Sequence, residues 1–160
     1  MLDIITQLKD KRSIELTLIG QGSQKSELEK LVRERKLPIR FIDKIPYEKM
    51  SECHRESDCF ISTSFAEGHP KALIEAMSSA LPCLVSNSPG NRTLVRNAQN
   101  GLILELDHVE QWVSLALDLI DHPEHRKKLG LSAREWIIKN FDINQTLRRE
   151  LDFLLRIAEN

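Results

Sequence analysis

The sequence has 160 residues, of which 41% are hydrophobic and 29% are charged, an ordinary composition for a soluble globular chain. Its 23 basic and 24 acidic residues leave a formal net charge of −1, so electrostatics give no reason to expect nucleic acid as a partner. The length suffices for one domain with a full core. Because no linker, repeat or low-complexity segment interrupts it, we expect a single domain over residues 1–160.

Three cysteines, Cys53, Cys59 and Cys83, lie in or beside apolar runs and form no C-x-x-C pair. Such cysteines predict buried free thiols in a reducing compartment. No apolar run approaches the roughly 20 residues of a membrane span, and the N-terminal residues are too short and too charged a stretch for a secretory signal. The sequence therefore favours a cytoplasmic protein, with peripheral attachment to the inner face of the membrane left open.

Predicted helices and strands alternate along the chain. The first half reads, in order, as a helix over residues 2–11, a strand over 14–20, a helix with Ser23 as its candidate N-cap, a strand over 39–43 and a helix over 46–56. The second half reads as a strand over 58–64, a helix over 70–80, a strand over 81–87, a helix over 91–98, a strand over 102–106, and helices over 108–121, 123–139 and 144–158. This alternation predicts an α/β domain with a Rossmann-like parallel sheet of about five or six strands and helices on both faces.

In an open parallel sheet, ligands bind beyond the carboxyl ends of the strands. The loop before the helix at 70–80 is the most informative one at that edge, within the stretch SFAEGHPKALIEAMSSALP. Its Gly68 permits a tight bend, and a proline opens the helix. The backbone amides of Lys71, Ala72 and Leu73 would then point out of the positive end of the helix, which suits a phosphate.

Two glutamates flank this helix start, Glu67 on the loop and Glu75 one turn after Lys71. A carboxylate beside a phosphate is unfavourable unless it serves another atom, such as a sugar hydroxyl. The ordinary alternative is a capped helix in which Lys71 and Glu75 form an i,i+4 ion pair. Spacing alone leaves both interpretations open.

Two further motifs are weaker. Gly20 and Gly22 in LIGQGS would let a phosphate or sugar approach the end of a strand, although G-x-G without a third glycine is also typical of a plain βα turn.

His122 and His125 could touch one metal ion, but no third ligand is evident. A solvated helix cap is the favoured interpretation of the two histidines. His69 has no visible serine or cysteine partner.

In their order along the chain, these stretches resemble the C-terminal, donor-binding half of a GT-B glycosyltransferase of the retaining family 4 type (glycosyl transferases group 1). The resemblance covers nearly the whole chain. It is carried by LTLIGQGS, by the run from IRFID to EGHP, by EGHPKALIE with its E-x7-E motif of Glu67 and Glu75, by EAMSSALPCLVSNSPGNRTLV and by NGLILELD. The family usually has a glycine where Ala80 stands, which is a mild departure.

The resemblance implies a role for each part of the site. Glu75 would bind the ribose hydroxyls of a sugar nucleotide, and Glu67, as the catalytic residue, would contact the donor sugar. The implied donor-binding residues are Gly20, Gly22, Lys44, Ile45, Gly68, His69, Pro70, Lys71, Ala72, Leu73 and Glu75. Among them, Lys44 and Ile45 would flank the base, and the two glycines would let the diphosphate approach.

The resemblance also implies the reaction and what is missing from this chain. A hexosyl group would move from a UDP- or GDP-linked sugar to a glycan or lipid-linked acceptor, with no cofactor and no metal. An N-terminal acceptor domain would lie upstream, so the chain would be one half of a GT-B enzyme and inactive alone. Two alternatives stay open: half of a sugar-nucleotide epimerase, and a non-catalytic Rossmann-like interaction domain.

Overall fold

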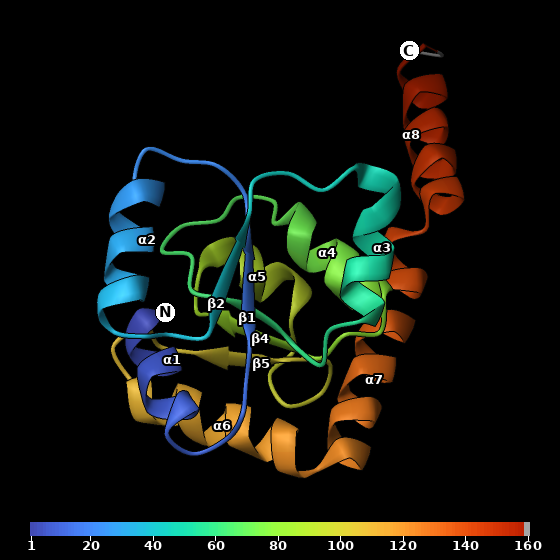
Figure 1. Ribbon diagram of the computed structural model, residues 1–160. Helices are drawn as coiled ribbons and strands as arrows, with labels where there is room; N and C mark the ends of the chain where they lie inside the picture. Colours follow the sequence, from blue (N-terminus) through green and yellow to red (C-terminus); the bar gives the residue numbers. More distant parts are fainter. Residues whose placement is uncertain (159–160) are drawn as a thin grey trace.

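The computed structural model describes residues 1–158, apart from the side chains of residues 143, 145, 146 and 149. Strands and helices follow one another in the predicted order (Figure 1). The first half contains α1 (Leu2–Lys9), β1 (Leu16–Ile19), α2 (Lys25–Glu34), β2 (Ile39–Ile42) and α3 (Tyr47–Arg55). The second half contains β3 (Phe60–Ser62), α4 (Lys71–Ser78), β4 (Cys83–Ser86), α5 (Pro89–Leu94), β5 (Leu102–Leu104), α6 (Val109–Asp121), α7 (Pro123–Phe141) and α8 (Ile143–Ala158).

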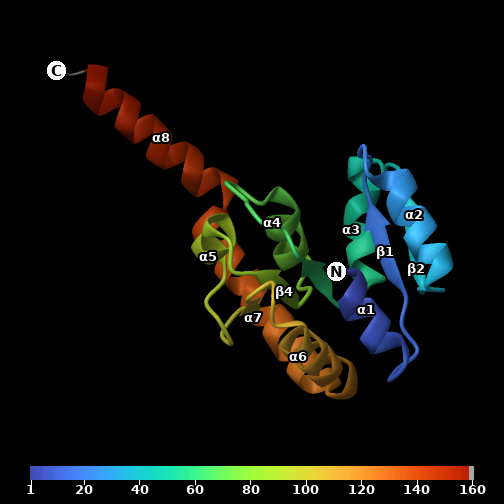
Figure 2. The same cartoon turned by 90° about the vertical axis from the view of Figure 1, so that its left-hand side faces the viewer.

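Every strand pair among residues 1–158 is parallel, which confirms the α/β fold class, but the five strands found there divide between two sheets. β1 pairs with β2, with Leu16 opposite Ile39, and the second sheet has the order β3-β4-β5. β4 is buried along its whole length, as a central parallel strand should be, whereas β1 and β3 are mostly half-buried edge strands. Figure 2 shows β1 and β2 beside α2 and α3, and β4 among α4, α5 and α7.

The expectation of one continuous sheet rested on the tendency of consecutive strands to be neighbours, which holds for roughly two-thirds of them. Here the chain passes through α3 from the first sheet to the second, so β2 and β3 are consecutive but not adjacent.

One apolar cluster is shared by both sheets, because Leu16 of β1 and Ile39 of β2 pack against it. Ile4, Ile5 and Leu8 of α1 are almost fully buried, and they belong to the same cluster as Leu84 of β4 and the fully buried Trp112 of α6. Each such side chain contributes roughly 1.5–3 kcal/mol on burial. The core therefore holds the two sheets together although no backbone ladder joins them within the described part of the chain.

Three helix starts differ from their predicted positions. Ser23 is not an N-cap, because α2 begins at Lys25. The N-cap position is taken by Gln24, which forms no side-chain cap. Pro46 and Pro70 precede α3 and α4 instead of occupying their first turn, since their ψ angles of 140° and 85° lie outside the helical region.

The helix predicted over residues 91–98 is displaced toward the N-terminus, where α5 begins at Pro89. Ser88 Oγ caps this helix by accepting a hydrogen bond from the Asn91 amide at 3.4 Å. The helix ends early because Asn100 accepts from the Arg96 amide at 2.6 Å and donates to the Leu94 carbonyl at 3.1 Å. These bonds hold the following loop in a non-helical form.

α8 projects away from the rest of the molecule in both views (Figures 1 and 2). Leu147, Leu151 and Leu154 are exposed along it. Within the described residues, no helix combines the length and the apolar character that crossing a membrane requires.

Candidate functional site

The loop after β3 is fixed to the loop after β4 at the carboxyl edge of the second sheet. Ser86 Oγ donates to the Ser64 carbonyl at 2.5 Å, and the Gly90 amide donates to the Glu67 carbonyl at 2.9 Å. Both bonds connect segments that leave neighbouring parallel strands. The loop that carries Glu67 is thus held at two points.

Gly90 is needed for this close approach. A Cβ atom at this position would lie 2.5 Å from the Glu67 carbonyl oxygen and 2.9 Å from that of Gly68. Contacts this short are excluded for real side chains, so only glycine allows the two loops to meet in this way. Gly90 lies within the segment EAMSSALPCLVSNSPGNRTLV that carried the resemblance, but nothing in the sequence indicated its partner.

The start of α4 offers two free backbone amides. The Lys71 amide donates to the His69 carbonyl at 3.0 Å, and the first helical bond runs from the Ile74 amide to the Pro70 carbonyl at 3.1 Å. The expectation that the Lys71 amide is free is therefore wrong. The amides of Ala72 and Leu73 form no hydrogen bond with any described residue.

Both glutamates of the motif are half-buried. Neither the Glu67 nor the Glu75 carboxylate forms a hydrogen bond or an ion pair with any residue whose side chain the structure describes. The i,i+4 ion pair between Lys71 and Glu75, on which the ordinary alternative depended, is absent from that part of the chain, and Lys71 is exposed. Each carboxylate thus keeps its full capacity to accept hydrogen bonds from hydroxyl groups.

The loops after β1 and β2 form a second group at the carboxyl edge of the first sheet. Gly20 has φ +139°, a conformation that favours glycine, and a Cβ on Gly22 would meet no atom within 4 Å. Lys25, the first residue of α2, pairs with Asp43 in the loop after β2. This hydrogen bond lowers the pKa of the Asp43 carboxyl and raises that of Lys25. Sequence reasoning missed the pair because 18 residues separate its members.

Lys44 is exposed and Ile45 is half-buried in this same loop. The structure thus brings the predicted base-flanking residues next to the Gly20–Gly22 loop through the Lys25–Asp43 pair. No hydrogen bond or ion pair among the described residues joins this group to the loop of Glu67.

A buried histidine that the sequence did not single out contacts the C-terminal end of α4. His54 is 8% exposed, and its Nδ1 lies 3.3 Å from Ser79 Oγ. Ser79 Oγ in turn donates to the Glu75 carbonyl at 3.0 Å. The sequence did offer one signal. His54 follows the apolar Met50 by four residues, a spacing that places both on the same face of α3.

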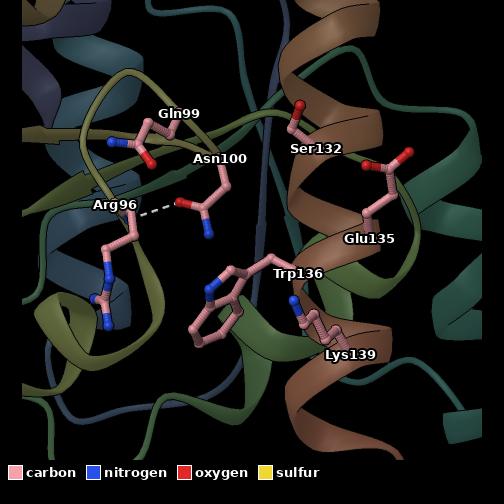
Figure 3. Close-up of a pocket in the computed structure, with 7 residues that line it drawn as sticks. All are labelled: Arg96, Gln99, Asn100, Ser132, Glu135, Trp136 and Lys139. Carbon is pink, nitrogen blue, oxygen red and sulfur yellow. Dashed lines mark hydrogen bonds between the residues drawn. The ribbon is translucent and has the colours of Figure 1, made fainter.

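Aromatic rings continue from the loop toward a shallow cavity. His69 lies 6.4 Å from Phe141, which lies 5.6 Å from Trp136, measured between ring centroids. The cavity beside Trp136 has a volume of 270 Å³, and Figure 3 shows the indole between the side chains of Arg96 and Lys139. It is lined by Arg96, Gln99, Asn100, Ser132, Glu135, Trp136 and Lys139. None of these is a predicted site residue, and the Arg96 guanidinium lies over the indole at 5.7 Å.

His122 and His125 both contact Asp118. Their Nδ1 atoms lie 2.9 Å and 2.7 Å from its carboxylate oxygens, so the three side chains connect the end of α6 to the start of α7. All three side chains are at least one-third exposed, as expected of solvated side chains. His122, the residue before α7, forms no side-chain cap, so that part of the helix-cap interpretation is wrong. Within the described residues, no three His, Cys, Asp or Glu side chains are grouped so as to hold a metal ion.

Comparisons with known proteins agree with this arrangement. The family model described as glycosyl transferases group 1 matches residues 1–136. A UDP-Gal:alpha-D-GlcNAc-diphosphoundecaprenol alpha-1,3-galactosyltransferase from Escherichia coli is 31% identical over 106 residues, which are 66% of this chain and 27% of that protein. A poly(ribitol-phosphate) alpha-N-acetylglucosaminyltransferase from Staphylococcus aureus is 23% identical over 91% of this chain and 30% of its own length.

Solved structures share the fold. The C-terminal domain of a glycosyl transferase group 1 family protein from Francisella tularensis superposes with a TM-score of 0.76 at 20% identity, over 89% of this chain and 77% of that one. A pneumococcal O-GlcNAc transferase in complex with UDP and GlcNAc superposes with a TM-score of 0.86 at 16% identity, over 99% of this chain and 33% of that one.

The chain spans about 30% of the length of the two curated relatives named above. The family match covers most of it and includes the loop of Glu67, the start of α4 and Glu75. The parallel strands and the helices that cover them are those of GT-B structures. This chain therefore belongs to the glycosyl transferases group 1 family.

Proposed function

We propose that this chain binds the nucleotide-sugar donor of a retaining hexosyltransferase. The observation that carries the proposal is the half-buried carboxylate of Glu75, which no residue with a described side chain pairs and which lies one turn from the free amides of Ala72 and Leu73. Ribose hydroxyls would donate to the carboxylate, and the diphosphate would accept from the two amides at the positive end of the helix. A carboxylate and an anion site can be neighbours when each serves a different part of one ligand.

The donor sugar would lie at the loop of Glu67. The Gly90 amide fixes the backbone of this residue while its carboxylate stays free of described partners. Gly68 and His69 follow it on the exposed lip of the loop, and the buried Pro70 anchors the loop to α4. Glu67 is therefore the residue we assign to the reacting sugar.

The remaining donor contacts would come from the first sheet. Gly20 and Gly22 leave open space for the diphosphate at the end of β1. Lys44 and Ile45 would flank the base from the loop after β2. Lys25 is already bound to Asp43, and this bond holds the two loops together.

Catalysis would rest on charge stabilisation and positioning. The bond between the anomeric carbon and the diphosphate oxygen breaks, and the leaving negative charge is stabilised by the helix amides. A new bond forms from the acceptor oxygen to the same carbon, and the acceptor hydroxyl passes its proton to the leaving diphosphate. Because the chain spans about 30% of the relatives' length, we assign the glycan or lipid-linked acceptor to protein outside this chain. The chain alone should bind donor and transfer nothing.

The nucleotide is proposed to be uridine or guanosine diphosphate, with uridine tested first. The galactosyltransferase from Escherichia coli is named for a UDP sugar and a lipid diphosphate, and the pneumococcal transferase was solved with UDP. A lipid-linked acceptor would place the enzyme in the cytoplasm at the inner face of the membrane. Half of an epimerase and a non-catalytic interaction domain lack comparable support among these relatives.

Calorimetry with UDP and GDP on this chain tests the proposal. We expect one of the two to bind at millimolar concentrations or below, and Glu75→Ala to weaken that binding. Glu110→Ala, at an exposed position of α6, is the matched control and should bind as the unaltered chain does. If neither nucleotide binds the unaltered chain at millimolar concentrations, the donor-binding proposal fails.

A further inference from the structure

His54 is the only imidazole among the buried polar side chains of the described residues, and it contacts the helix that carries Glu75. Its Nδ1 lies 3.3 Å from Ser79 Oγ at the C-terminal end of α4. The same hydroxyl donates to the Glu75 carbonyl at 3.0 Å. A hydrogen-bonded chain thus runs from His54 through Ser79 to the backbone of Glu75.

We assign the tautomer of the ring from these bonds. A serine hydroxyl has one proton, and we give it to the Glu75 carbonyl, because a carbonyl oxygen can only accept. The oxygen can therefore only accept from His54, so Nδ1 carries the proton and Nε2 of the neutral ring does not. A proton gained by His54 must go to Nε2.

The ring and the Glu75 carboxylate also interact through their charges. Burial lowers the pKa of His54, and the Glu75 carboxylate opposes this by raising it, with burial the larger effect. Neutral His54 leaves the carboxylate unpaired, and within the described residues no ion pair competes for it. On α3 itself, the charged neighbours Glu52 and Arg55 are exposed.

We propose that His54 is a positioning residue for Glu75 that gives nucleotide binding an acid limit, meaning a pH below which the affinity falls. As a neutral ring it holds the end of α4 through Ser79 and leaves the Glu75 carboxylate free for ribose hydroxyls. When Nε2 gains a proton, the imidazolium attracts the carboxylate and competes with those hydroxyls. The nucleotide part rests on the proposed function, whereas the coupling between His54 and Glu75 does not.

The first test measures the coupling without any nucleotide. The imidazole C–H resonances of the five histidines are followed by NMR against pH, with His54 assigned from its loss in His54→Asn. We expect the midpoint of His54 to lie below its ordinary value of 6.5 and to fall further in Glu75→Gln, because the raising charge is gone. The same midpoint in both proteins would overturn the coupling.

The second test measures donor binding between pH 5 and 8. UDP-glucose is the probe, because its diphosphate carries no group that titrates in this range. The affinity of the unaltered chain should fall by about fivefold or more on acidification, and that of His54→Asn, whose amide can still donate to Ser79, should stay level. His54→Gln replaces His54→Asn if the latter does not fold.

The two failures can be told apart. Binding with the same pH profile in both proteins would overturn the role of His54 and leave the proposed function intact. No binding of UDP-glucose at any pH would overturn the proposed function together with this acid limit.

Discussion

The Gly90 amide nitrogen lies 2.9 Å from the Glu67 carbonyl oxygen, and this one bond ties the loop of the first motif glutamate to the start of α5. It joins two segments that leave adjacent parallel strands, β3 and β4. The position of Glu67 therefore depends on a residue 23 positions further along the chain. The side-chain roles proposed for the loop follow from this backbone contact.

Gly90→Ala should displace the loop of Glu67, because the added Cβ would lie 2.5 Å from the carbonyl oxygen of that residue. Since Glu67 is assigned to the sugar, we expect the affinity for UDP-glucose to fall about tenfold, or roughly 1.4 kcal/mol, and that for UDP to fall less. Calorimetry with both ligands measures the difference. Pro89→Ala, at the exposed neighbouring position, is the control. An equal loss of both affinities would contradict the assignment of Glu67 to the sugar.

Ala80→Gly should stabilise the chain. Ala80 has φ +59°, a left-handed conformation in which a Cβ costs roughly 1–2 kcal/mol. The greater freedom of glycine in the unfolded chain offsets part of that gain, so we expect a net increase of about 0.5–1 kcal/mol in the free energy of unfolding. Urea denaturation measures it. Ala116→Gly, within α6, should shift stability by about 1 kcal/mol in the opposite direction. A loss of stability in Ala80→Gly would show that φ is not the controlling factor.

His54 should make folding stability depend on pH. Because burial lowers its pKa in the folded chain below the ordinary value of 6.5, the unfolded chain binds more protons at mildly acidic pH. The stabilising contribution of the neutral ring is thus present above pH 6.5 and is lost as the pH falls toward the folded-state pKa. Urea denaturation at several pH values should show a steeper loss for the unaltered chain than for His54→Asn. Parallel pH profiles would exclude this contribution.

The cysteines should differ in reactivity. Burial raises the pKa of Cys59 to about 12 and that of Cys83 well above its usual range, so both stay as neutral thiols. Thiolates are the reactive species, and a thiol-specific reagent at pH 8 should therefore label at most one thiol of the folded chain, Cys53, and all three after unfolding. Cys53→Ser should abolish the labelling of the folded chain. Rapid labelling of a second thiol in the folded chain would contradict the raised pKa of Cys59 and Cys83.

The sequence was enough to predict the order of the strands and helices and the place of the two glutamates. Both conclusions depend on local signals, since apolar spacing defines α4 and the motif places Glu67 and Glu75 at its start. The contacts that fix the site were not predictable in this way. The bond from Gly90 to Glu67 and the pair of Lys25 with Asp43 depend on which strands become neighbours.

Helix starts show the same limit on a smaller scale. The intrinsic preference of proline favours Pro70 in the first turn of a helix. In the structure the Lys71 amide donates to the His69 carbonyl, and the helix begins one residue later, at Lys71. The division into two sheets is a further example, because strand pattern alone does not state which edges form hydrogen bonds.

The central claim is that the Glu75 carboxylate accepts hydrogen bonds from ribose hydroxyls. The most direct test compares UDP with 2′-deoxy-UDP by calorimetry on the unaltered chain, on Glu75→Ala and on the control Glu110→Ala. A hydrogen bond to a charged acceptor contributes roughly 1.5–3 kcal/mol, so the unaltered chain and the control should prefer UDP by about tenfold or more, and Glu75→Ala should bind both ligands equally. Equal binding of the two ligands by the unaltered chain, or an undiminished preference in Glu75→Ala, would contradict the account.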